Sequence, residues 1–126
     1  NEWNHYRIEA IGKHIRTLEG HSQGGLLTPW QTAFIEHFSF QCGYCTAGFL
    51  NEGQVLLERL AAEPIPRADL EQTILEALDG HLCRCTGYVR YHQAVRDVIL
   101  ADAARYLQAE AGMTGGAAPA AKGDRR

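Results

Sequence analysis

Apolar residues recur at helical spacing in four stretches of the chain, and this pattern predicts an all-α protein. The first helix is expected to begin after Thr28, which can cap its N-terminus, because Pro29 suits a first turn and Gln31 can complete a capping box. The helix is expected to continue into Phe40-Gln41. The residues that follow one another at helical spacing are Trp30, Ala33, Phe34, His37 and Phe38.

Three further helices are predicted after the first, and residues 1–20 show only a weak alternation that favours a short extended segment. Gly112 onward is rich in glycine and alanine without apolar periodicity, so residues 112–126 are predicted to be a flexible tail. The expected helices run from near Thr46 to Glu63-Pro-Ile-Pro66, from Ala68 or Asp69 to Gly80, and from about Tyr91 to Ala111.

Four cysteines fall in the turns between these helices. Cys42 and Cys45 follow the first helix, Cys83 and Cys85 follow the third, and 37 residues separate the two pairs. The similar segments after Cys45 and Cys85 indicate a weak repeat of roughly 40 residues. We therefore expect a four-helix bundle with approximate two-fold symmetry and with both cysteine turns at one end.

Composition and charge narrow the function classes. A chain of 126 residues fits one domain with short extensions. Twelve Lys and Arg against 15 Asp and Glu give a net charge of −3, which argues against a nucleic-acid-binding protein built on a basic face. No apolar run is long enough to span a membrane, and the chain shows no secretory signal segment, so a cytoplasmic location is expected. Export to the periplasm together with a partner stays open.

Four thiols in two close pairs suit several kinds of chemistry. A disulfide framework is disfavoured without a secretory signal, and thiol–disulfide catalysis at Cys42 and Cys45 would leave Cys83 and Cys85 unexplained. Zinc bound by four thiolates would join the hairpins without redox chemistry. A [2Fe-2S] cluster uses two thiolates for each iron, which suits paired spacing. Zinc and iron–sulfur are the two alternatives that this reasoning leaves open.

The neighbours of the cysteines favour the iron–sulfur alternative. Gly43, Gly48 and Gly87 allow the backbone to approach a negatively charged cluster closely, and helix N-termini stabilise such charge. Arg84, between two of the cysteines, supplies a positive charge that would raise a reduction potential, although an outward-pointing, solvated arginine is an equal alternative.

The segments Gln41-Cys-Gly-Tyr-Cys-Thr-Ala-Gly-Phe49 and Leu82-Cys-Arg-Cys-Thr-Gly-Tyr88 resemble the helical [2Fe-2S] domain of the molybdenum hydroxylases. That family includes xanthine dehydrogenase and aldehyde oxidoreductase, and the resemblance covers roughly residues 15 to 100. It implies that residues 21–111 form the helical [2Fe-2S] domain. Residues 1–20 would be a remnant of, or junction to, an upstream ferredoxin-like domain that carries a second [2Fe-2S] cluster.

The resemblance also implies a function. The chain would be the electron-transfer subunit of an oxidoreductase complex, without substrate chemistry of its own. It would accept electrons from a molybdopterin–molybdenum cofactor held by a large partner subunit. The electrons would pass to a further acceptor, such as the second cluster, an FAD subunit or a cytochrome.

Carried onto this sequence, the resemblance makes Cys42, Cys45, Cys83 and Cys85 the cluster ligands. Gln41 would approach the pterin of the partner through its side chain, and Cys85 would lie beside the pterin as well. Phe38-Ser39-Phe40 is bulkier than the family's usual small residues at this place, and we expect these residues to pack in the core.

Overall fold

The computed structural model describes residues 16–22 and 24–109, and every regular element in this part of the chain is a helix, with no strand. The predicted all-α class is confirmed, whereas the two-fold symmetry stays a prediction. Of the extended segment expected within residues 1–20, residues 1–15 lie outside the described residues, and the chain forms a short 3-10 helix at Leu18–His21 instead of extended backbone. The tail 112–126 also lies outside the described residues. The elements are η1 (Leu18–His21), α1 (Pro29–Glu36), α2 (Thr46–Ala62), η2 (Arg67–Asp69), α3 (Leu70–Leu78), α4 (Val89–Ala101) and α5 (Ala103–Tyr106).

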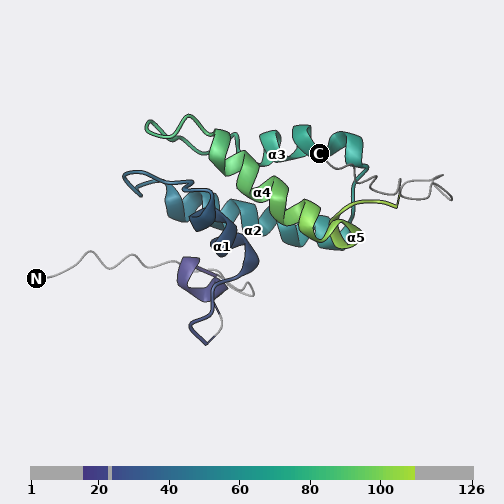
Figure 1. The fold of residues 1–126 in the computed structure, drawn as a ribbon, viewed down its shortest axis with the longest axis horizontal. Coiled ribbons are helices and arrows are strands. Elements are labelled where there is room, and N and C mark those ends of the chain that lie inside the picture. The colour runs from purple at the N-terminus through teal and green to yellow at the C-terminus, as the bar shows by residue number, and fades with distance from the viewer. Residues whose placement is uncertain (1–15, 23, 110–126) are drawn as a thin grey trace, which may run out of the picture.

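The four longer helices pack side by side. α4 contacts α1 and α3, and α2 contacts the same two helices (Figure 1). Within the described residues, no helix is long and apolar enough to cross a membrane.

The start of α1 is as predicted. The Thr28 hydroxyl accepts a hydrogen bond from the Gln31 backbone N–H at 3.2 Å, and the Gln31 side-chain oxygen accepts one from the Thr28 N–H at 2.9 Å. These reciprocal bonds form a capping box, and Pro29 occupies the first turn. The helix that delivers the chain to the first cysteine turn therefore has a fixed beginning.

The end of α1 differs from the prediction. The helix ends at Glu36, not at Phe40-Gln41, and Phe38 adopts a positive φ of 50° that no helix contains. Ser39 is buried and its hydroxyl donates to the Arg90 carbonyl at 3.0 Å. Phe38 is 70% exposed and Phe40 41% exposed, so the expectation that both phenylalanines pack in the core is wrong.

The fourth predicted helix is divided. α4 ends at Ala101, Asp102 leaves the helical region with φ −129° and ψ 55°, and α5 supplies one further turn. Leu107 is then extended and pairs with Ile65 in the linker between α2 and α3. The Gln108 N–H donates to the Ile65 carbonyl at 2.9 Å, and the Ile65 N–H donates to the Tyr106 carbonyl at 3.3 Å. We call this pairing the linker clasp.

An aromatic stack forms the centre of the core. Tyr91 of α4 is fully buried between Phe34 of α1, at a ring-centroid distance of 5.2 Å, and Phe49 of α2, at 4.0 Å. Offset stacking of this kind adds to the energy of burial. The three rings join three helices directly behind the cysteine turns.

Trp30 fills a second part of the core. Its indole is 2% exposed and donates a hydrogen bond to the Leu50 carbonyl at 2.9 Å. Gly53 leaves the room for it, because a Cβ at that position would lie 2.6 Å from the indole ring. α1 and α2 therefore approach each other through one large and one small residue.

A candidate four-cysteine metal centre

The first cysteine turn connects α1 to α2. Gly43 adopts a φ of +82°, which glycine reaches without strain, and its carbonyl accepts from the Thr46 N–H at 3.2 Å. Cys45 is the N-cap residue of α2. The turn therefore places a thiol directly at the positive end of a 17-residue helix.

The second cysteine turn leads into α4. Gly87 and Tyr88 both have a φ of +69°, and the Tyr88 N–H donates to the Thr86 hydroxyl at 3.3 Å. The Tyr88 hydroxyl accepts from the Cys83 N–H at 2.9 Å. These bonds tie the turn to the start of α4, so that Cys83 and Cys85 also lie at a helix N-terminus.

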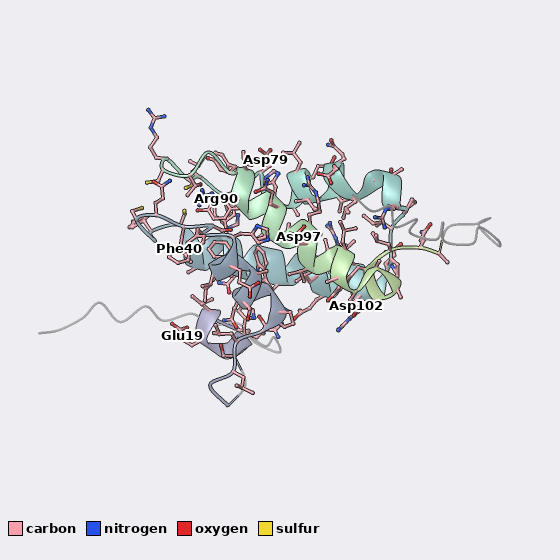
Figure 2. All side chains as sticks on the ribbon, in the orientation of Figure 1. Glu19, Phe40, Asp79, Arg90, Asp97 and Asp102 are labelled. Carbon is pink, nitrogen blue, oxygen red and sulfur yellow. The ribbon has the colours of Figure 1, made fainter. Side chains whose placement is uncertain are left out.

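The two turns meet, as the sequence predicted. Figure 2 shows the sulfur atoms, in yellow, gathered on the left between the two loops. Cys42 Sγ lies 3.6 Å from Cys85 Sγ, and both residues are exposed. Cys45 Sγ and Cys83 Sγ lie 3.3 Å and 3.4 Å from the hydroxyl oxygen of Tyr91. All four thiols are free.

The thiols thus form two pairs. The pairing is crossed, because each pair combines one cysteine from the first turn with one from the second turn. We call Cys42 and Cys85 the outer pair, and Cys45 and Cys83 the inner pair; Cys83 is 8% exposed. In the part of the chain that the structure describes, no three His, Cys, Asp or Glu side chains are grouped around a single ion position. A [2Fe-2S] cluster takes two thiolates on each iron, and this division into pairs fits that arrangement.

In the outer pair, the surroundings lower the pKa of one cysteine and raise the pKa of the other. The Tyr44 backbone N–H, and then the Cys85 thiol, lower the pKa of Cys42. Contact with the Cys42 thiol in turn raises the pKa of Cys85. One sulfur of this pair therefore reaches the thiolate form, which is the form that binds metal, more readily than a free cysteine.

In the inner pair, too, the pKa of one cysteine is lowered and the pKa of the other is raised. Burial raises the pKa of Cys83, but hydrogen bonds from the Thr86 and Tyr91 hydroxyls and from backbone N–H groups outweigh it, and the pKa falls to about 6. Burial raises the pKa of Cys45 despite its contact with Tyr91. Thiolate ligands, N–H donors and two helix N-termini are the surroundings that a negatively charged iron–sulfur cluster needs, so the residues present fit such a group.

Other residues take up positions around this centre. Gln41 is exposed beside the outer pair, and Arg84 is exposed between Cys83 and Cys85. The Arg90 guanidinium of α4 lies 3.4 Å from the Phe38 carbonyl, which joins α4 to the segment that leads into the first cysteine turn. Sequence reasoning placed Tyr91 only at the beginning of a helix and missed its contact with the inner pair. A helical side chain points back toward the N-terminus, and this is the signal that places Tyr91 behind the second turn.

Comparisons with known proteins agree with this geometry. The profile of the family described as "[2Fe-2S] binding domain" matches residues 17–96, and the chain belongs to that family. The small subunit of nicotine 6-hydroxylase from Paenarthrobacter nicotinovorans is 49% identical over 89 residues, which cover 71% of this chain and 50% of the relative. The xanthine dehydrogenase iron-sulfur-binding subunit of Escherichia coli O157:H7 is 38% identical over 88 residues, covering 70% and 53%.

A solved structure is similar as well. Quinoline 2-oxidoreductase from Pseudomonas putida 86 superposes with a TM-score of 0.55 at 42% identity, over 71% of this chain and 51% of that one. The chain spans about half the length of the curated relatives it matches.

Proposed function

We propose that the four cysteines hold one [2Fe-2S] cluster, with the outer pair on one iron and the inner pair on the other. The observation that carries this proposal is the crossed pairing of the thiols, two by two, at the N-termini of α2 and α4. Such a cluster accepts and releases one electron at a time. The protein supplies the thiolates, the N–H donors around them and a core that shields the inner pair from water.

The chain then serves as the electron-transfer part of a molybdenum-hydroxylase-type oxidoreductase. Relatives named as a hydroxylase small subunit and as a dehydrogenase iron-sulfur-binding subunit support this role, and so does the similarity to quinoline 2-oxidoreductase. The electron donor is a molybdopterin–molybdenum cofactor in a large partner subunit, where the substrate is oxidised. The further acceptor is a second [2Fe-2S] cluster, an FAD subunit or a cytochrome, and the complex is cytoplasmic.

The surface around the outer pair supports docking of that large subunit. Large apolar side chains are exposed on and next to both cysteine turns, and a monomeric protein gains nothing from leaving them in water. Tyr44, between the first two cysteines, is 97% exposed, and Leu82, directly before Cys83, is 87% exposed. Phe38, Phe40 and Val89, in the segments next to these turns, are exposed as well. Docking of the partner on these side chains would bring Gln41 and Cys85 against its cofactor.

Metal and sulfide analysis tests the proposed cluster. The purified protein is expected to be red-brown and to contain two irons and two acid-labile sulfides per chain. Its EPR signal should appear only after one-electron reduction, because the oxidised pair of irons has no net spin. Stoichiometric zinc with no visible absorbance would instead establish a structural four-cysteine zinc domain.

Gln41→Ala is expected to slow electron transfer from the molybdenum centre to the cluster. The amide would be lost from the contact with the pterin, and a missing hydrogen bond of about 1 kcal/mol corresponds to a rate about fivefold lower. Stopped-flow reduction of the cluster by substrate in the assembled complex measures this rate.

The matched control for that experiment is Gln93→Ala, which removes an exposed amide from α4. Both variants should keep the cluster spectrum and the subunit composition of the wild-type complex. Equal reduction rates in all three proteins would place Gln41 outside the electron route.

A further inference from the structure

Tyr91 is the one described side chain that contacts both sulfurs of the inner pair through a hydroxyl group. Its oxygen lies 3.3 Å from Cys45 Sγ and 3.4 Å from Cys83 Sγ, within the range of hydrogen bonds to sulfur. The two cysteines come from different turns, so the hydroxyl lies between the ligands of one iron. A hydroxyl group at this place can affect the negative charge on the two sulfurs as well as the packing around them.

The direction of this hydrogen bond follows from the chemistry of metal binding. A thiolate bound to iron has lost its hydrogen and can only accept. The Tyr91 hydroxyl must then donate, and its single hydrogen is directed at one or both of these sulfurs. The residue is completely buried, so water does not compete for the hydrogen.

The ring is also held in place. Phe34 and Phe49 stack on Tyr91 at centroid distances of 5.2 Å and 4.0 Å, and the interplanar angle to Phe49 is 13°. Tyr91 belongs to the first turn of α4, which the second cysteine turn anchors. The hydroxyl therefore cannot swing away when the charge on the sulfurs changes.

We propose that Tyr91 is a positioning residue that raises the reduction potential of the cluster by donating a hydrogen bond to the inner pair. This inference rests on the proposed function, because it requires iron at the inner pair. Reduction adds one electron and no proton, and the added negative charge is shared by the ligand sulfurs. A hydrogen bond to those sulfurs becomes stronger in the reduced state and stabilises it relative to the oxidised state.

Tyr91→Phe tests this proposal, since it removes the hydroxyl and keeps the stacked ring. The ratio of reduced to oxidised cluster at a fixed potential is expected to fall about tenfold, which for one electron is a decrease of about 59 mV. Redox titration of the intact complex, followed by EPR of the reduced cluster, measures the shift. Tyr106→Phe is the matched control, because Tyr106 is a buried tyrosine in α5 that contacts no cysteine.

A second variant strengthens the same hydrogen bond instead of removing it. A fluorotyrosine incorporated at position 91 has a more acidic hydroxyl and is a stronger donor, so the potential is expected to rise above that of the wild type. If Tyr91→Phe fails to retain the cluster, this nearly isosteric variant decides the question alone. A shift of the expected sign supports the hydrogen bond, whereas an unchanged potential overturns it.

The outcomes also separate this inference from the proposed function. Absence of iron and sulfide from the wild-type protein overturns the cluster itself. Wild type and variants that contain equal iron, melt at the same temperature and share one potential overturn only the role of Tyr91.

Discussion

Replacing Cys83 with serine is expected to abolish the cluster and to destabilise the fold together with it. Cys83 is buried, and its sulfur lies 3.0 Å from the Thr86 hydroxyl and 3.4 Å from the Tyr91 hydroxyl. Because the free energy of metal binding contributes to folding, loss of the cluster should lower the free energy of unfolding by about 3 kcal/mol or more. The visible spectrum measures the first effect, and thermal unfolding followed by circular dichroism measures the second.

Two further variants serve as comparisons for Cys83→Ser. Cys42→Ser removes an exposed member of the proposed ligand set and should bleach the protein equally, but with a smaller cost in packing. Ala47→Ser places a serine at an exposed position of α2 and should leave both the colour and the melting temperature unchanged. A Cys83→Ser protein that is colourless and yet keeps its helicity and melting temperature would show that the bundle stands without the cluster.

Trp30→Ala is expected to cost about 3–5 kcal/mol of unfolding free energy, without removing any ligand of the metal centre. The substitution empties the space above Gly53 and deletes the hydrogen bond to the Leu50 carbonyl. A loss of this size is a large fraction of the stability of an ordinary domain. Denaturant unfolding of the loaded protein, followed by circular dichroism, measures the loss.

The control is Val55→Ala, which shortens an exposed side chain on the same helix α2 and should change the unfolding free energy by less than about 0.5 kcal/mol. If Trp30→Ala also costs less than about 1 kcal/mol, the contact between α1 and α2 does not depend on the indole.

The sequence predicted those features that local chemistry determines. Thr28 and Gln31 form the capping box because their spacing suits it, and α2 begins at Thr46 as expected. The convergence of the cysteine turns followed from the spacing of the helices that flank them. The ligand roles of the four cysteines and the pterin contact of Gln41 remain proposals that the experiments above test.

What the sequence did not predict depends on contacts between distant segments. Helical spacing continues through Phe38, but the buried hydrogen bond from Ser39 to the Arg90 carbonyl draws the chain out of the helix. Likewise α4 stops at Ala101, since Leu107 pairs with the linker at Ile65. Tyr91 was missed for the same reason, because its partners Cys45 and Cys83 come from two separate turns.

The linker clasp holds the end of the bundle that lies away from the cysteine turns. It fastens the α5 end of α4 to the linker between α2 and α3 through backbone hydrogen bonds that need no cofactor. The cysteine turns lie at the opposite end of α4 (Figure 1). The clasp end of the bundle is therefore held without the metal centre, and loss of the cluster is expected to loosen the cysteine turns while the clasp stays closed.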